Sequence, residues 1–320
     1  MMFEQVIQAI KEQKDVVLAT HVLPDGDAIG SVLALGMVLR GLGKNVVATW
    51  SGRMEVPEQY RYLAGQELLA AEEYIPERPA FLIALDCGSR ERLGSIEKKF
   101  KKAELTANID HHRNNTEYAQ INAVDPLSPA TSELVYELVR EMGLDINRDV
   151  AECLYTGLVT DTGRFQYTNT NAKAFKMAAD LVDIGVDPSR IFRYVYENST
   201  YKRLMLAGLA LSKTVLDNDI GFIYTVITKE DFASTGATVE DTENLIDSLR
   251  AVTGIEVAAV LKETGGGLRV SLRSTGRVDV GKIAESKGGG GHKLAAGYNA
   301  VGHAEDAVAD LKHKLLSVKA

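Results

Sequence analysis

Cysteine is nearly absent from this chain of 320 residues: its two cysteines, Cys87 and Cys153, lack the CxxC spacing of redox or zinc motifs. Two thiols are too few for a disulfide framework, which favours a reducing compartment. No stretch approaches the roughly 18 uninterrupted apolar residues of a membrane span. The N-terminus, Met1-Met2-Phe3-Glu4, also lacks a basic region followed by an apolar core. We therefore expect a cytoplasmic protein with no membrane partner.

The chain also has fewer positively than negatively charged residues. The chain has 36 Lys and Arg against 44 Asp and Glu, a net charge of -8 and a pI of about 5.4. This balance argues against a protein that coats long duplex nucleic acid, but it is compatible with short or small phosphorylated substrates. Low-complexity tracts, repeats and Ser/Pro-rich linkers are missing as well. The length and the 45% apolar content favour about two domains and are sufficient for an enzyme.

The first part of the chain alternates predicted strands and helices. Strands are predicted at 15–20, 45–49, 81–85 and 105–109, and helices at 3–13, from the loop after His21 to about Leu42, and at 132–142, 149–159 and 172–184. The runs at 81–85 and 105–109 are continuously apolar, as in buried parallel strands. This order predicts an α/β domain with a mainly parallel sheet flanked by helices.

A long helical pattern from 189 to 216, with Pro188 near its start, is the predicted connector between domains. Beyond it, the pattern predicts a strand at 222–227, a helix at 241–253, a hairpin of 257–261 with 268–272, and helices at 278–286 and 304–318. We therefore expect a first domain at 1–188, a helical connector at 189–215 and a smaller α/β domain at 216–320.

Acids and histidines follow three of the predicted strands. They are His21, Asp25 and Asp27 after the first, Asp86 after the third, and Asp110, His111 and His112 after the fourth. A single aspartate at a strand end is usually a turn former, but three such ends are hard to explain as turns. Because parallel strands deliver their carboxyl ends to one edge, we expect these side chains to meet there. Successive strand side chains alternate in direction, so one of the adjacent histidines is expected to hold a cation while the other faces substrate.

Asp161, just beyond the predicted helix 149–159, supplies a further carboxylate, although alone it is more often a helix-end residue than a ligand. Four carboxylates and two imidazoles form an oxygen-rich set that suits manganese, magnesium or ferrous iron. Four negative charges balance two divalent cations, and paired cations clamp the oxygens of an in-line phosphoryl displacement. The proposed ligands are His21, Asp25, Asp27, Asp86, His111 and Asp161. The set predicts phosphate ester hydrolysis.

A glycine run, Gly288-Gly289-Gly290-Gly291, precedes His292 in the predicted second domain. A flexible turn is the simplest interpretation of such a run. Between Lys262 and Lys293, however, seven Lys and Arg stand against three Asp and Glu, a local charge of +4. Glycines also let a phosphate approach backbone N–H groups near a helix start. We therefore favour a phosphate clamp in which Arg273 and Ser274 act with the glycine run.

Five segments together resemble the successive motifs of the DHH/DHHA1 phosphoesterase superfamily. They are His21-Val-Leu-Pro-Asp25-Gly-Asp27, Leu85-Asp86-Cys87, Ile109-Asp110-His111-His112, Thr160-Asp161-Thr162-Gly163 and Gly288-Gly-Gly-Gly-Gly-His292. Within the superfamily, the chain is most similar to the stand-alone, two-domain nanoRNases of the NrnA type, which also act as 3′-phosphoadenosine 5′-phosphate (pAp) phosphatases. The resemblance covers nearly the whole chain.

The resemblance implies a role for each motif residue. His21 and Asp25 would bind one metal ion, with Asp27, His111 and Asp161 binding the other and Asp86 bridging the pair. His112 would contact the scissile phosphate, and Asp110 would hold an imidazole in the right tautomer, with a strand-terminating cap as its alternative role. In the second domain, substrate would be bound by Arg273, Ser274, Gly289, Gly290, Gly291 and His292.

We therefore expect an enzyme with two divalent ions, preferably Mn²⁺ with Mg²⁺ or Fe²⁺ as alternatives, and its active site in the cleft between domains. It would hydrolyse very short RNA oligonucleotides to mononucleotides and dephosphorylate pAp to AMP. A linear or cyclic dinucleotide phosphodiesterase is one alternative. A non-catalytic nucleotide sensor is another, although a sensor would be expected to have lost metal ligands. The glycine-histidine loop argues against a family II pyrophosphatase, and the length against a processive RecJ-type exonuclease. A homodimer is compatible with the sequence.

Overall fold

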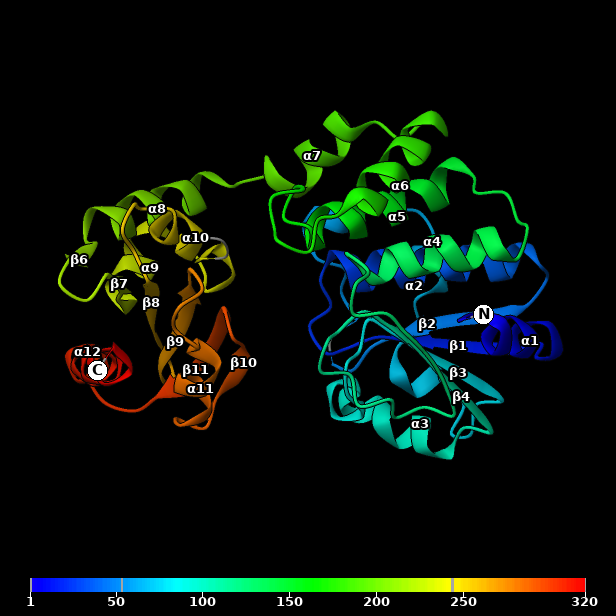
Figure 1. Ribbon diagram of the computed structural model, residues 1–320, viewed down its shortest axis with the longest axis horizontal. Helices are drawn as coiled ribbons and strands as arrows, with labels where there is room; N and C mark the ends of the chain where they lie inside the picture. The colour runs from blue at the N-terminus through cyan, green and yellow to red at the C-terminus, as the bar shows by residue number, and fades with distance from the viewer. Residues whose placement is uncertain (1, 53, 243–244, 320) are drawn as a thin grey trace. The chain divides into compact units, whose positions relative to one another are not determined.

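The computed structural model describes residues 2–52, 54–242 and 245–319, and the side chains of His292, Val318 and Lys319 lie outside the described part. The chain forms two compact units, Met1–Asn198 and Ser199–Ala320. Each unit contains one β-sheet with helices on both faces, which confirms the expected α/β class (Figure 1). In the described ranges, no helix has both the length and the apolar character needed to cross a bilayer.

The sheet of the first unit is wholly parallel, with strand order β2-β1-β3-β4-β5. Its strands are β1 (Asp15–Ala19), β2 (Asn45–Thr49), β3 (Phe81–Leu85), β4 (Leu105–Asp110) and β5 (Ile121–Val124). The first four confirm the predicted strands. The edge strand β5 was not predicted, because its four residues are mostly half-buried and carry too short a pattern.

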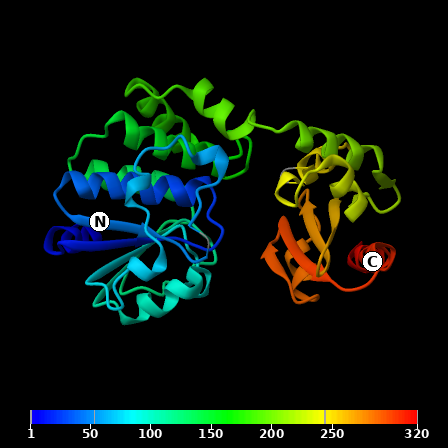
Figure 2. The same ribbon diagram turned by 180° about the vertical axis from the view of Figure 1, so that it is seen from behind.

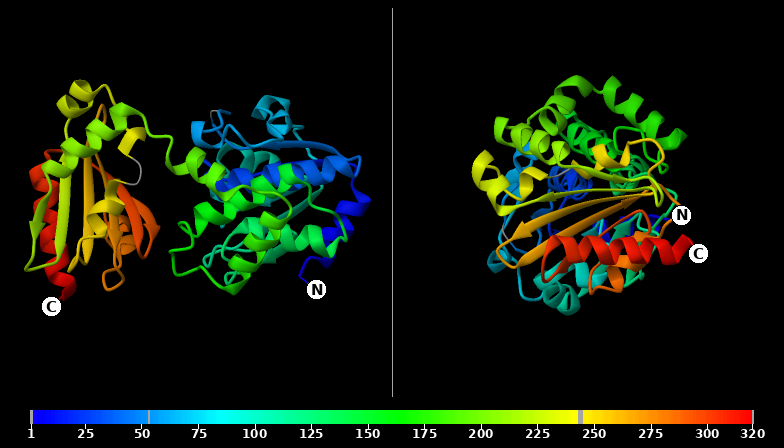
Figure 3. Two further views of the ribbon diagram at one scale, coloured as in Figure 1. Left: turned by 90° about the horizontal axis from the view of Figure 1, so that it is seen from above. Right: turned by 90° about the vertical axis from the view of Figure 1, so that its left-hand side faces the viewer.

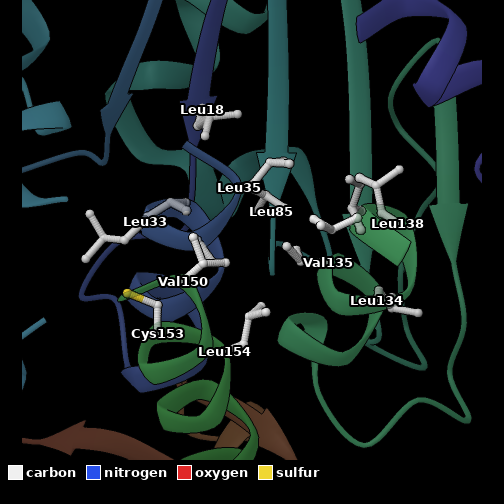
Figure 4. Close-up of a cluster of buried hydrophobic side chains, with 14 of the residues drawn as sticks. Leu18, Leu33, Leu35, Leu85, Leu134, Val135, Leu138, Val150, Cys153 and Leu154 are labelled. Atoms are coloured by element: carbon white, nitrogen blue, oxygen red, sulfur yellow. The ribbon is translucent and has the colours of Figure 1, made fainter. Parts of the chain in front are cut away.

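The alternation of strand side chains divides the first core into two layers. Leu18 and Leu85 face the large core formed with α2 (Gly26–Gly41), α4 (Thr131–Glu141) and α5 (Arg148–Asp161) (Figure 4). Leu82 and Ala84 face the opposite layer, where η4 (Arg90–Ile96) and α3 (Glu97–Lys102) pack (Figure 2). The remaining helices of this unit are α1 (Glu4–Glu12), α6 (Ala172–Asp183), α7 (Pro188–Tyr196) and the short η1 (Glu58–Tyr60), η2 (Gln66–Leu68) and η3 (Glu72–Tyr74).

Helices α2 and α5 pack backbone to backbone at one glycine. A Cβ placed on Gly30 would lie 2.4 Å from the carbonyl oxygen of Cys153. Only glycine permits this approach, since the obstructing atom belongs to the backbone of α5 and has no rotamer to change. The close crossing fixes the N-terminus of α2 relative to the C-terminus of α5. Both ends carry candidate metal ligands.

The predicted long helix from 189 to 216 is wrong, because the structure breaks it into α7 and α8 (Tyr201–Ser212). The side chain of Thr200 accepts a hydrogen bond from the backbone N–H of Arg203 and so begins a new helix. The division between the two units falls in this break, at Asn198 and Ser199.

The sheet of the second unit is mixed, with strand order β10-β11-β9-β8-β7-β6 and one parallel pair, β7 with β8, among the described strands. Its strands are β6 (Val215–Asp217), β7 (Phe222–Ile227), β8 (Val257–Thr264), β9 (Gly267–Ser274), β10 (Gly290–His292) and β11 (Ala295–Ala300). The predicted strand and hairpin are confirmed, with a longer hairpin. Helices α11 (Val280–Glu285) and α12 (Ala304–Lys319) pack on one face, and α8, α9 (Lys229–Thr235) and α10 (Leu245–Arg250) lie on the other (Figure 3).

Two predictions for the second unit are corrected. The expected helix 241–253 is divided into η5 (Glu240–Thr242) and the shorter α10, while 243 and 244 lie outside the described residues. The expected helix start after the glycine run is wrong, because β10 and β11 form an antiparallel hairpin there. A Cβ on Gly289 would lie 2.2 Å from the carbonyl oxygen of Gly297, so close contact within the sheet explains this glycine.

Candidate active site

The carboxyl ends of three neighbouring strands form the floor of the candidate site. Strands β1, β3 and β4 are adjacent in the sheet, and His21, Asp86 and His111 follow them directly or within two residues. Asp86 adopts a left-handed conformation with φ of 53°, which aspartate tolerates better than most residues. The backbone N–H of Asp86 donates to the carbonyl oxygen of Ile109 at 3.1 Å, so the turn stays tied to β4. The predicted convergence of strand ends is confirmed.

Two helix ends bring the remaining carboxylates. Asp25 caps α2 by accepting hydrogen bonds from the N–H groups of Asp27 and Ala28, both at 3.1 Å. Asp27 is the second residue of the helix and is 1% exposed. Asp161 is the last residue of α5, and its carboxylate accepts a hydrogen bond from Asn169 Nδ2 at 3.2 Å.

The side chains assemble into three groups of donors that share members. The groups are His21 with Asp25 and Asp86, then Asp27 with His111 and Asp161, and Asp86 with His111 and His112; within each, the donor atoms lie within 4.8 Å of one another. All six predicted metal ligands therefore meet, together with His112. The group with His21 and the group with Asp27 are linked by a separation of 3.6 Å between Asp86 Oδ1 of the first and His111 Nε2 of the second.

The distances between donors suit atoms that share a cation. His21 Nε2 lies 3.6 Å from Asp86 Oδ2, and His111 Nε2 lies 3.6 Å from Asp161 Oδ2. These separations are too long for good hydrogen bonds. A cation about 2.1 Å from each of two donors leaves those donors about 3 to 4 Å apart. The oxygen-rich donor set, with two imidazoles, therefore fits divalent metal ions.

Electrostatic crowding in the cluster favours the same conclusion. Burial and the neighbouring Asp86 raise the pKa of Asp27 to about 7. Burial lowers the pKa of His111, but the carboxylates of Asp161, Asp86 and Asp27 outweigh it and raise that pKa to about 9. Burial would raise the pKa of Asp86, yet the surrounding imidazoles hold it well below its usual value. Without a cation the cluster retains protons, which divalent metal ions would displace.

Each histidine is oriented by a partner at Nδ1. Nδ1 of His21 lies 2.9 Å from the carbonyl oxygen of Val22, and Nδ1 of His111 lies 3.2 Å from that of Ser128. A carbonyl oxygen only accepts, so Nδ1 carries the proton and Nε2 is turned into the cluster as a donor atom for metal.

His112 is oriented by a carboxylate instead. Asp110 Oδ1 lies 2.7 Å from His112 Nδ1, and Asn115 Nδ2 donates to the other oxygen of Asp110 at 2.6 Å. Burial lowers the pKa of His112, but the hydrogen bond and charge of Asp110 outweigh it, so that pKa is raised. The Asp110 carboxylate thus contacts an imidazole and does more than end a strand.

The sequence did not predict the polar residues that donate hydrogen bonds to the candidate metal ligands. The backbone N–H groups of Thr131 and Ser132 donate to Asp27 at 2.6 and 2.9 Å. The Thr131 hydroxyl donates to Asp86 Oδ1 at 2.9 Å. These contacts join α4 to segments far away in the chain. The only local signal is a pair of hydroxyl residues at a predicted helix start, which is common at helices that bind nothing.

The predicted substrate residues of the second unit lie close together in its sheet. Arg273 on β9 and His292 on β10 are both paired with Ala295 of the strand between them. Arg273 Nε lies 3.9 Å from Asp247, while the N–H of Ser274 donates to the carbonyl oxygen of Leu294 at 2.9 Å. The glycines Gly290 and Gly291 lie on β10, with Gly289 immediately before them, and the side chain of His292 lies outside the described part.

Comparison with known proteins gives matches to both units. The family model described as DHH family, N-terminal domain, matches residues 15–158, and the DHHA1 domain model matches residues 219–318. The bifunctional oligoribonuclease and PAP phosphatase NrnA of Thermus thermophilus is 35% identical over 295 residues, covering 92% of this chain and 86% of that protein. The protein of the same name from Bacillus subtilis is 30% identical, covering 92% and 91%.

One solved structure matches closely. The crystal structure of an exopolyphosphatase-related protein from Bacteroides fragilis superposes with a TM-score of 0.94 at 27% identity, covering 99% of this chain and 96% of that one. Both domains occur in the expected order, and the predicted resemblance is confirmed. The chain therefore belongs to the DHH family of phosphoesterases and combines its N-terminal domain with a DHHA1 domain.

Proposed function

We propose that this protein hydrolyses very short RNA oligonucleotides to mononucleotides and dephosphorylates pAp to AMP. The observation that carries the proposal is the set of three donor groups, two of them sharing Asp86, at the carboxyl ends of β1, β3 and β4. Relatives named as bifunctional oligoribonuclease and PAP phosphatase cover most of the chain and support the substrate class.

The six ligands would hold two divalent cations, preferably Mn²⁺. His21 and Asp25 would serve one, Asp27, His111 and Asp161 the other, and Asp86 both, in agreement with the observed groups. The cations would supply Lewis-acid stabilisation of the charge that develops on the phosphoryl oxygens.

His112 would act on the phosphate directly. Its Nδ1 is held by Asp110, which leaves Nε2 as the ring nitrogen to contact a phosphoryl or leaving-group oxygen. The contact with the Asp110 carboxylate favours the protonated ring, which suits His112 to donate a hydrogen bond or a proton. Asp110 and Asn115 orient this group and do not contact substrate themselves.

The second unit would grip a substrate phosphate. Arg273 supplies a guanidinium beside the glycine strand, since Arg273 and His292 flank the small residue Ala295 in the sheet. Gly290 has no left-handed φ, and no described atom lies within 4 Å of the place that its Cβ would take. Neither backbone conformation nor packing thus requires glycine there, and substrate approach would explain it.

Turnover of labelled substrates in Mn²⁺ tests the proposal. We expect release of mononucleotide from an RNA dinucleotide and of phosphate from pAp, with a 24-mer barely degraded. Asp86→Ala should abolish both activities, whereas Asp145→Ala, in an exposed loop, should leave them unchanged. Failure of the wild type to hydrolyse either small substrate would reject the proposal. Hydrolysis of a cyclic dinucleotide alone would favour the dinucleotide phosphodiesterase alternative.

Substrate contact at the glycine strand has its own test. Gly290→Ala should raise KM for the dinucleotide by about tenfold, the effect of losing about 1.4 kcal/mol of binding. The matched control is Gly265→Ala in the turn of the β8–β9 hairpin, where a Cβ also meets no described atom. Equal KM values for both variants would contradict a phosphate contact at Gly290.

A further inference from the structure

The segment that leads from β5 into the start of α4 contacts two carboxylates of the candidate metal site, Asp27 and Asp86. Thr131, the first residue of α4, is fully buried. The Thr131 backbone N–H donates to Asp27 Oδ2 at 2.6 Å, and the hydroxyl of the same residue donates to Asp86 Oδ1 at 2.9 Å. Asp27 lies on α2 and Asp86 follows β3, so one residue joins carboxylates from two separate elements.

We infer that Thr131 is a positioning residue that sets the separation of the Asp27 and Asp86 carboxylates before metal binds. This role rests on the proposed function only in supposing that the cluster binds divalent cations. The Thr131 backbone N–H belongs to the first turn of α4, where N–H groups have no partner within the helix. Its hydroxyl sits on a β-branched side chain with few rotamers. Both donors are therefore rigid relative to each other.

The chemistry of the contacts suits a metal site. Buried carboxylates that share one site repel one another. A lysine or arginine would relieve the repulsion but would also compete with the metal ions. Neutral donors stabilise the carboxylates without adding a cation, and the two oxygens that accept from Thr131 each keep a further acceptor position for metal.

The residues on either side of Thr131 hold it in place. The hydroxyl of Ser128 lies 2.8 Å from the carbonyl oxygen of Ala130 and 2.7 Å from the carboxylate of Glu133. The carbonyl oxygen of Ser128 meets Nδ1 of His111 at 3.2 Å, so the same segment orients a third ligand. Ser132 adds a backbone N–H to Asp27 Oδ1 at 2.9 Å.

Thr131→Val isolates the hydroxyl, because valine has nearly the same shape and retains the backbone N–H to Asp27. Mn²⁺ affinity is measured by titration calorimetry on the metal-free full-length protein, without substrate. We expect affinity to fall about 10- to 100-fold, the usual effect of removing a group that orients a ligand. Thr131→Ser, which keeps a hydroxyl, should restore it. At saturating Mn²⁺ the kcat of Thr131→Val should approach that of the wild type.

The matched control is Thr225→Val in the second unit. Thr225 is also fully buried, and its hydroxyl donates to the carbonyl oxygen of Ala210 at 2.6 Å. Both valine variants should lower the melting temperature of the metal-free protein by comparable amounts, but only Thr131→Val should weaken Mn²⁺ binding. Wild-type Mn²⁺ affinity in Thr131→Val, or an equal loss in Thr225→Val, would overturn the inference.

The test also covers a Thr131→Val variant that does not fold and a protein that does not hydrolyse the proposed substrates. If Thr131→Val does not fold, Thr131→Ala removes the same hydroxyl with less volume and takes its place in the comparison. Since Mn²⁺ affinity is read without substrate, the pattern across the variants supports the inference even if RNA dinucleotides and pAp are not hydrolysed. In that case only the proposed function fails.

Discussion

Replacement of Asp27 by asparagine should separate metal binding from stability. Asp27 is buried and its pKa is raised from 3.8 to about 7. A difference of about 3 pKa units corresponds to about 4 kcal/mol of free energy that the ionised carboxyl costs the metal-free fold. Because the folded-state pKa is the higher one, this cost begins above pH 3.8 and is complete above about pH 7.

Asparagine removes that charge but introduces a new mismatch. The two oxygens of Asp27 accept from the N–H groups of Thr131 and Ser132. Asparagine offers only one oxygen, so its NH₂ group faces another donor, at a cost of about 1–3 kcal/mol. At high pH, the cost of the ionised Asp27 carboxyl is larger than the cost of the misplaced NH₂ group. At pH 8 the metal-free Asp27→Asn variant should be more stable than the wild type by about 1–3 kcal/mol, and near pH 5 the difference should approach zero.

Metal should reverse the order of stability. At a Mn²⁺ concentration of about 1,000 times Kd, the wild type gains about 4.1 kcal/mol, which exceeds the advantage of the metal-free variant. The variant lacks one ligand and should gain little. Guanidinium unfolding followed by the fluorescence of Trp50 measures these differences, since this single tryptophan is buried in the core of the first unit.

The control is Asp145→Asn, which removes the same charge from an exposed loop and should change stability little at either pH. The reasoning is refuted if metal-free Asp27→Asn is less stable than wild type by about 2 kcal/mol or more at pH 8. It is also refuted if Mn²⁺ stabilises the variant as much as the wild type.

Two further predictions concern the packing around the site. Burial raises the pKa of Glu133 from its ordinary value of 4.5 to about 7. Ionisation of this carboxyl therefore weakens the fold as the pH rises from 4.5 to 7. Relative to the wild type, Glu133→Gln should gain stability from pH 5 to pH 8. Glu141→Gln, exposed on the same helix, should show no such trend in thermal melts. Gly30→Ala forces a Cβ against the Cys153 backbone, and the overpacking of about 1–3 kcal/mol should outweigh the gain of about 1 kcal/mol in helix propensity. Gly41→Ala, where a Cβ meets no described atom, should not lower the melting temperature, and an equal fall in both variants would contradict the explanation by close helix contact.

The sequence alone indicated all three strands that deliver ligands, β1, β3 and β4. The runs before Asp86 and Asp110 are short, continuous and apolar, so they read as buried parallel strands, and both are confirmed. The sequence predicts a helix start after the glycine run, but the end of that run is the first strand of the β10–β11 hairpin. Its residues are mostly glycine and alanine, whose pattern does not distinguish strand from turn without knowledge of the neighbouring strand β9.

Residue types and their order along the chain determined which side chains were candidates for the metal cluster. Carboxylates and imidazoles after apolar runs are recognisable locally, because burial of such groups is unfavourable unless something binds them. Tertiary structure alone decided how they are held. The contacts of Thr131 with Asp27 and Asp86, and of Ser128 with His111, join residues remote in sequence. No local pattern encodes such contacts, since they exist only when α2, β3, β4 and the turn before α4 meet in the folded core.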